Sequence, residues 1–395
     1  MRQFILALGL LAGITAQAAT LADVLDKAWL RLPQAQSQAS REVELKANQA
    51  AASSMFPSPP ALGLGHRSDR FNRNSGSREY EVELSVPLWL PGEKTARQRL
   101  ATSESGRFTA EQLALRLQLA GQLREAIWQV KLAETAQELV QNRLVSARQI
   151  EADVARRVKA GESARTDLLL VQSETMAAQV ALADADRTLI AARQAYKRIV
   201  GDDAMPPAQP EAVALDRDIA VHPLLVSKRN RVEVVQAKAR LVSETRRDNP
   251  ELSLGARRER GEFNERFGST LAVSVKIPFG TESRNAPRIA AAQAESTEAE
   301  IEYQRQRFDI EQDIQKARAD VEIAKQRSEL AGSRRSLAEE NLQLIKKAFS
   351  LGERSLFEFQ RTQALLNDAA LAASEAKIEM NLTYARLNQA MGVLP

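Results

Sequence analysis

The chain has 395 residues, of which 55 are lysine or arginine and 51 are aspartate or glutamate, so its formal net charge is only +4. It contains no cysteine and two histidines, which excludes disulfides, thiolate metal sites, a cysteine nucleophile and a histidine-rich metal cage. Aromatic residues make up 5% and charged residues 27% of the chain. This composition favours long helices in thin layers over compact cores, and the small charge excess predicts no nucleic-acid partner.

The first residues have the three parts of an export signal. Arg2 supplies the positive charge, residues 4–14 are apolar, and Ala16 and Ala18 form a small-residue cleavage pattern. We expect residues 1–18 to be removed near Ala18. The apolar run is too short to span a bilayer as a helix. The alternative to an export signal is a buried N-terminal helix.

The chain carries an internal repeat at a spacing of 189 to 191 residues. The matched pieces are residues 60–67 with 250–257, residues 85–86 with 274–275, Pro87 with Pro278, Gly161 with Gly352, and Gly201 with Gly392. Copies of this length are too long for a solenoid unit and predict a pseudo-twofold duplication of one module. We expect a first repeat over residues 19–201, a linker over 202–220 and a second repeat over 221–395.

Each repeat begins with a helical pattern and then changes to a period of two. In the first repeat the helix covers residues 21–54 and stops before Pro57. Alternating apolar and polar residues then predict two strands per repeat, each with one apolar and one polar face. The expected strands cover residues 61–70, 79–89, 251–260 and 269–278.

Strands of about ten residues have the length that crosses a hydrocarbon layer when tilted. Four such strands cannot close a barrel, because small closed barrels need about eight or more, so several chains would have to contribute. The alternative is a pair of ordinary hairpins packed on the helices of a soluble protein.

Two long helices and two return helices follow the strands. The long helices are expected over residues 93–159 and 284–350, each about 100 Å at 1.5 Å per residue, and the return helices over 165–200 and 356–391, each about 55 Å. Apolar residues recur at heptad spacing, which predicts antiparallel coiled coils with narrow, alanine-rich seams. The seam positions are Leu168, Val171, Thr175, Ala178, Leu182, Ala185, Leu189, Ala192, Tyr196 and Ile199, and Ile314, Ala317, Val321, Ala324, Ala331, Ala338, Leu342, Ile345 and Phe349.

The duplicated helix, hairpin and helix pair, together with the signal sequence, resembles the TolC-type outer-membrane efflux proteins. The most specific segments are the strand exits at residues 85–94 and 274–280 and the helical turns at residues 158–163 and 349–354. No single segment is specific alone, but they recur together at one spacing, and the resemblance covers the whole mature chain.

The resemblance implies a mainly α-helical protein with a β-barrel part. Three chains would each give four strands to one twelve-stranded barrel, continued by a trimeric α-helical tunnel in the periplasm of a Gram-negative cell. It also implies a passive duct rather than an enzyme, with no cofactor and no resident metal. Its partners would be a periplasmic adaptor protein, an inner-membrane transporter of the resistance-nodulation-division type, and the lipid of the outer membrane.

The two helical turns would be the periplasmic tips of the tunnel. By resemblance, Gly161, Glu162, Gly352 and Glu353 would contact the adaptor protein, and glycine suits such a turn because it tolerates positive φ.

The same resemblance places the entrance gate just beyond the tips. Asp167 and Arg354 match positions that pair across the closed entrance, and Glu358 matches an acidic ring, whose crowded carboxylates should have raised pKa values. Two residues depart from the family pattern: Arg361 could pair with Glu358 and weaken the ring, and Phe349 replaces a hydrogen-bonding tyrosine. The alternative is that these charges lie on an ordinary helix surface.

The expected function is therefore an exit duct of a tripartite efflux system. Residues 87–94 resemble the heavy-metal branch, so metal cations or small toxic compounds are the expected cargo. A type I protein secretion duct is the first alternative, and a periplasmic coiled-coil scaffold is the second.

Overall fold

A computed structural model describes residues 20–213, 217–280 and 282–395. The expected signal sequence at residues 1–18 lies outside these described residues. Across the described part of the chain, no helix combines the length and the apolar character that a membrane crossing needs.

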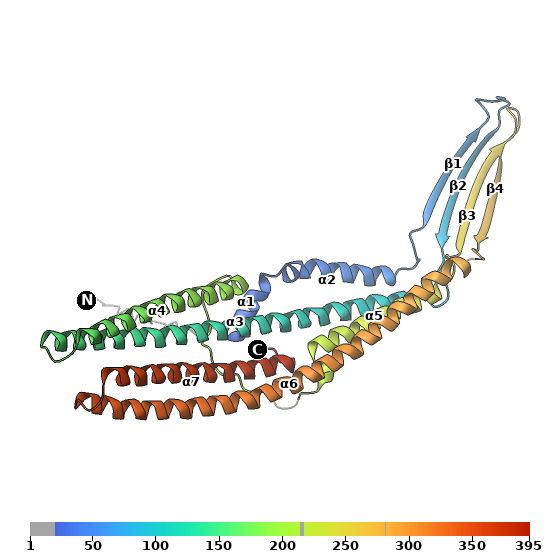
Figure 1. The fold of residues 1–395 in the computed structure, drawn as a ribbon. Coiled ribbons are helices and arrows are strands. Elements are labelled where there is room, and N and C mark those ends of the chain that lie inside the picture. The colour runs from blue at the N-terminus through green and yellow to red at the C-terminus, as the bar shows by residue number, and fades with distance from the viewer. Residues whose placement is uncertain (1–19, 214–216, 281) are drawn as a thin grey trace, which may run out of the picture. The chain divides into compact units, whose positions relative to one another are not determined.

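The same series of elements occurs twice along the chain (Figure 1). The strands and long helices begin and end close to the ranges expected from the sequence. The first series is α1 (Leu21–Leu30), α2 (Pro33–Ala52), β1 (Ala61–Ser68), β2 (Arg78–Pro87), α3 (Glu93–Lys159) and α4 (Arg165–Val200). The second is the short 3-10 helix η1 (Ile219–Val221), α5 (Pro223–Glu244), β3 (Glu251–Arg260), β4 (Gly268–Lys276), α6 (Glu282–Ser350) and α7 (Leu356–Ala390).

The first helical segment differs from the single helix expected over residues 21–54. It is broken into α1 and α2 at Arg31 and Leu32. Pro33 explains the break, because a proline has no N–H to donate and disfavours helical geometry in the residue before it. The separate start of α1 is stabilised by a capping box between Thr20 and Asp23.

The chain divides into two compact units, and each takes segments from both sequence repeats. One unit contains α1, α4, α7 and the later parts of α3 and α6, while the other contains α2, α5, the four strands and the earlier parts of α3 and α6. The compact units therefore do not coincide with the repeats.

In the strand-containing unit, one antiparallel sheet has the order β1-β2-β3-β4. Its central pair, β2 with β3, joins a strand of each repeat. The register brings the apolar residues of all four strands to one face in continuous rows. Those rows are Leu62–Leu84–Leu254–Val273 and Leu64–Val82–Ala256–Leu271.

The helix that follows β2 starts on a buried acid. Glu93 is fully buried, and its carboxylate accepts hydrogen bonds from the Leu90 amide at 3.1 Å and the Asn249 side chain at 2.6 Å. Arg97, one turn later, donates to the other carboxylate oxygen at 2.9 Å. These bonds satisfy the buried charge and fix the junction between β2 and α3.

Apolar clusters hold the helical unit together, and they include the expected heptad positions Ala178, Ala317 and Val321. Leu144 and Ala147 of α3 pack on Ala178 of α4, and Trp128 of α3 packs on Leu382 of α7. The seam between α6 and α7 includes Ala317, Val321, Leu387 and Met391. The long helices therefore follow the order α4, α3, α7, α6, which leaves α4 and α6 at the two ends of this row, and α1 contacts α4.

Candidate functional site at the helical tips

Both helical tips use the same backbone turn. At the first tip Gly161 has φ +78°, its amide donates to the Val158 carbonyl at 3.1 Å, and the Glu162 amide donates to the Arg157 carbonyl at 2.8 Å. These two bonds form a Schellman motif, which ends a helix by satisfying its last carbonyls and needs positive φ.

The second tip repeats this motif. Gly352 also has φ +78°, its amide donates to the Phe349 carbonyl at 3.1 Å, and the Glu353 amide donates to the Ala348 carbonyl at 2.9 Å. A Cβ atom at either glycine would meet nothing within 4 Å. Glycine is therefore required by the backbone conformation and not by lack of space. The acids that follow the two glycines, Glu162 and Glu353, are exposed.

Beyond the second tip, α7 begins with a capping box. The Ser355 hydroxyl accepts from the Glu358 amide at 3.2 Å, and the Glu358 carboxylate accepts from the Ser355 amide at 3.1 Å. Arg354 also donates to Glu358, at 2.9 Å. The Ser355 amide and the Arg354 guanidinium lower the pKa of Glu358.

Two expectations about Glu358 therefore change within one chain. Its cationic partner is Arg354 and not Arg361, since among the described residues no ion pair joins Arg361 to it. Its pKa is lowered, whereas a ring of facing carboxylates would raise it. Within one chain Glu358 thus caps α7 and pairs with Arg354, and the acidic ring between copies stays a prediction.

Asp167 occupies the same place on α4 that Glu358 occupies on α7, 191 residues earlier. The N-cap residue here is Ala164, which makes no side-chain hydrogen bond. No ion pair or side-chain hydrogen bond of Asp167 occurs within the described parts of the chain, so the structure does not pair it with Arg354. The two tips therefore share a turn but differ in their caps.

Phe349 packs inside the chain. Its ring stacks on Phe359 at 5.2 Å with an interplanar angle of 9°, and the Arg157 guanidinium lies 5.3 Å from its centroid. Val154, Val171 and Leu356 complete this apolar cluster with residues from all four helices. The phenylalanine thus holds the two helical hairpins together beside the tips.

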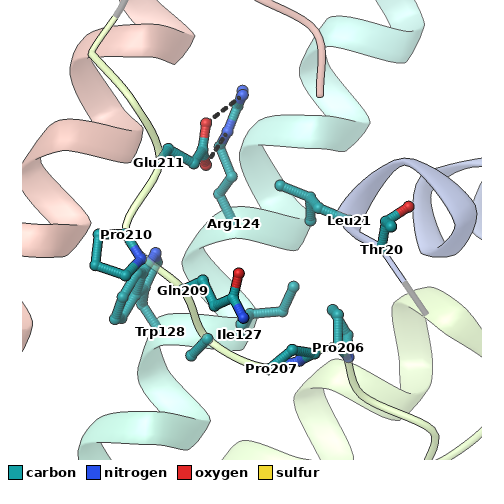
Figure 2. Close-up of a pocket in the computed structure, with 11 residues that line it drawn as sticks. Thr20, Leu21, Arg124, Ile127, Trp128, Pro206, Pro207, Gln209, Pro210 and Glu211 are labelled. Carbon is teal, nitrogen blue, oxygen red and sulfur yellow. Dashed lines mark hydrogen bonds and ion pairs between the residues drawn. The ribbon is translucent and has the colours of Figure 1, made fainter. Parts of the chain in front are cut away.

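A second polar site was missed by the sequence reasoning. Arg124 of α3 is 3% exposed, and it forms a two-bonded ion pair with Glu211 at 2.8 Å (Figure 2). It also donates to Gln389 at 2.8 Å, while Asn388 donates to Glu211 at 3.1 Å. This network ties the linker between the repeats to α3 and α7. The sequence around Arg124 carries no clear signal, since Glu125 follows it directly and Gln122 lies two residues before it.

A cavity of about 330 Å³ lies beside this ion pair. Figure 2 shows Trp128, Ile127 and the linker prolines around it. Within residues 20–213, 217–280 and 282–395, no group of three or more potential metal-ligating side chains is present.

The fold and the sequence together define the class of protein. The profile of the outer membrane efflux protein family matches residues 23–202 and again residues 215–393. The chain therefore belongs to this family, whose members are channel proteins and not enzymes.

Individual relatives agree with that assignment. The chain is 24% identical over 304 residues to the cobalt-zinc-cadmium resistance protein CzcC of Cupriavidus metallidurans, covering 73% of this chain and 70% of the relative. Its fold is similar to the outer membrane protein VceC of Vibrio cholerae, with a TM-score of 0.74, 15% identity and coverage of 94% and 96%. The CusC channel has a TM-score of 0.77 at 13% identity, with coverage of 95% and 92%.

The two tip caps predict opposite responses to exchanging serine and alanine. Ser355→Ala removes an N-cap worth about 1 kcal/mol, so amide exchange over residues 356–359 should speed up about fivefold. Ala164→Ser places a hydroxyl three residues before Asp167 and should slow exchange over residues 165–168.

The pH dependence of the Ser355→Ala effect follows from Glu358. The pKa of Glu358 in the folded protein lies below its ordinary value of 4.5. The ionised carboxylate therefore stabilises the cap fully above pH 4.5, and this stabilisation is lost as the pH falls through the pKa of the folded state. Hydrogen exchange measured down a pH series tests this. An equal response at both tips, or one independent of pH, would contradict the assignment.

The buried ion pair predicts a strong coupling between Arg124 and Glu211. Arg124→Leu should lower the free energy of unfolding by about 3 to 5 kcal/mol, because it leaves a shielded carboxylate without its partner. The double variant with Glu211→Leu should recover much of this loss. The control is Arg193→Leu, which breaks an exposed pair with Glu134 and should cost less than about 1 kcal/mol. Urea denaturation followed by circular dichroism measures all three, and additive losses would refute the coupling.

Proposed function

We propose that this protein is the outer-membrane channel-tunnel of a tripartite efflux system, built from three copies of the chain. The observation that carries this proposal is that, among the described residues, each edge strand of the sheet pairs on one side only and α4 and α6 each expose an apolar stripe. Family membership supports an outer-membrane efflux channel.

The edge helices each expose apolar residues at heptad spacing. On α6 the exposed fractions are 56% for Ile323, 64% for Leu330, 69% for Leu337 and 63% for Leu344. Leu351, one heptad further on in the tip turn, is 64% exposed. A helix with such a repeat is stable in water when a second helix covers it.

The other edge helix, α4, has a matching stripe. Leu169, Met176 and Ile190 lie at heptad positions and are 57%, 65% and 62% exposed. An edge of type α4 meeting an edge of type α6 is a heterologous contact, which closes into a ring when the rotation between copies permits it.

The two edge strands of the sheet can also pair with strands of a further copy. Within the described residues, β1 and β4 each pair with one strand only. Their order is antiparallel throughout, so β4 of one copy can pair with β1 of the next in the same sense. Three copies would give twelve strands, enough to close a barrel, with the exposed apolar face toward lipid and the charged face toward the lumen.

The cargo we infer is metal cations or small toxic compounds. This rests on the similarity to CzcC, which is named a cobalt-zinc-cadmium resistance protein. A type I protein secretion duct remains the alternative within this class, and a periplasmic coiled-coil scaffold would not need the exposed sheet face.

In this proposal the tips dock the partners and the residues beyond them form the gate. Gly161, Glu162, Gly352 and Glu353 would meet a periplasmic adaptor that links the duct to an inner-membrane transporter of the resistance-nodulation-division type.

The gate would depend on Asp167, whose carboxylate has no partner among the described residues and is available to a cation of the next copy. Arg354 would pair either with Glu358 of its own chain or with Asp167 of the neighbouring copy. Arg361 is exposed one turn further on, and Phe349 would keep the hairpins packed as the entrance opens.

The trimer is tested by placing a charge in one stripe. Leu337→Glu buries a carboxylate in the contact between copies and should abolish the heat-sensitive trimer on gels and reduce the protein in outer-membrane fractions. Leu365→Glu is the control, because this residue is 47% exposed on α7, which is not an edge helix. Wild-type protein recovered as a soluble periplasmic monomer would refute the duct.

The gate is tested by single-channel conductance in planar bilayers. Asp167→Ala combined with Arg354→Ala should raise the conductance, because it removes links between neighbouring copies. Glu322→Ala with Lys325→Ala removes an exposed ion pair elsewhere on α6 and should leave conductance unchanged. A double gate variant that conducts like the wild type would exclude these residues from the gate.

A further inference from the structure

The loop end of the sheet separates its charges by face. On the apolar face, the rows of leucine and valine give way toward the loops to the row of His66, Tyr80 and Arg258. The next row on the same face holds Arg78 directly opposite Arg260. Both rows lie at the end of the sheet where β1 joins β2 and β3 joins β4.

The acidic side chains of these strands alternate onto the other face. On that face Glu79 forms ion pairs with Arg67 and with Arg257, each at 3.1 Å. Arg257 also lies 3.5 Å from Glu81. The arginines of the polar face are therefore paired with glutamates of the same face, while the charged residues of the apolar face at this end are arginines only.

The arginines of the apolar face form no ion pair within the described residues. Like charges directly opposite on neighbouring strands destabilise a sheet, so the Arg78 and Arg260 pair needs a compensating anion. Among the loop acids, Asp69 accepts two bonds from Ser75 and Glu265 accepts the Gly261 amide at 2.7 Å. Within the described residues, neither these two acids nor Glu262 forms an ion pair with Arg78, Arg258 or Arg260.

Aromatic rings hold two of these arginines in place. The Arg258 guanidinium lies 5.1 Å from the Phe267 ring centre, and the Arg260 guanidinium lies 4.9 Å from the same ring and 5.8 Å from Phe263. Stacking on a ring leaves the in-plane N–H donors of a guanidinium available. The site is thus partly organised before any ligand binds.

The two loops are also joined to each other. Arg260 Nε donates to the Gly76 carbonyl at 3.1 Å, and the Phe263 amide donates to the Ser75 carbonyl at 3.1 Å. A Cβ atom on Gly76 would lie 2.5 Å from the Phe263 nitrogen. Glycine therefore permits the close approach that fixes Arg260 beside Arg78.

We propose that Arg78, Arg258 and Arg260 bind the phosphate groups of lipid A in the outer leaflet of the outer membrane. This rests on the proposed function, because it requires the apolar sheet face to contact lipid with its loop end outward. Arginine binds phosphate with two parallel hydrogen bonds, and the apolar rows next to the site suit acyl chains. Three guanidinium groups on two adjacent rows match a headgroup with two phosphates better than one with a single phosphate.

The test measures lipid binding to delipidated full-length protein by native mass spectrometry. The wild type should bind bisphosphorylated lipid A about tenfold or more tightly than its dephosphorylated form, since charge-assisted hydrogen bonds are lost with the phosphates. Arg78→Gln with Arg258→Gln should lose a similar factor while keeping the Arg260 bond that joins the loops.

The matched control removes two arginines from the opposite face at the same end of the sheet. Arg67→Gln with Arg257→Gln should bind lipid A like the wild type. Equal losses in both double variants, or no loss in the first, would overturn the proposal. Equal binding of phosphatidylglycerol, or displacement by millimolar inorganic phosphate, would overturn the assignment to lipid A.

The same samples separate this proposal from the proposed function. Trimer content on gels and conductance in planar bilayers are measured beside lipid binding. Conducting trimers of the wild type that show no preference for bisphosphorylated lipid A would refute the lipid site alone. Arg258→Lys provides a further variant, because it keeps the charge but loses the two-bonded geometry and should bind with intermediate affinity.

Discussion

The structure depends on apolar surface that one chain cannot cover by itself. A sheet of four strands leaves one apolar face and two edges exposed, and a row of four helices leaves an apolar stripe on α4 and another on α6. Because burial of apolar surface is the main favourable contribution to folding, this exposed apolar surface is the feature on which the proposed trimer and its contact with lipid rest. Its low aromatic content agrees with this, since helices packed side by side in a row have little interior to fill.

The duplicated module is similar in its backbone but not in its side chains. Both tips end in the same Schellman motif, with Gly161 and Gly352 at identical φ. The next turn differs, because Ser355 and Glu358 cap α7 while Ala164 cannot cap α4. The two hairpins therefore begin their return helices with different local stability. This asymmetry suits a ring whose two kinds of helical hairpin have different neighbours.

Charge is partitioned by register in the sheet and by burial in the helical unit. Alternation along β2 and β3 sends glutamates to one face and leaves Arg258 and Arg260 on the other. In the helical unit, Arg124 is buried but fully engaged by Glu211 and Gln389. In the sheet and in the helical unit alike, arginines lie beside apolar surface. The chain supplies an acidic partner for Arg124, whereas within the described residues Arg258 and Arg260 form no ion pair.

The sequence by itself determined the elements, because periods of two and of seven, prolines and glycines act through local backbone geometry. It predicted the strands, the long helices, the two tip glycines and the family resemblance. The first helical segment is the exception, because Pro33 divides it into α1 and α2. Only the tertiary structure decided that β2 pairs with β3 and that Arg124 holds the linker. These contacts join residues through side-chain reach and strand register, which depend on how distant segments meet and leave no periodic signal in the chain.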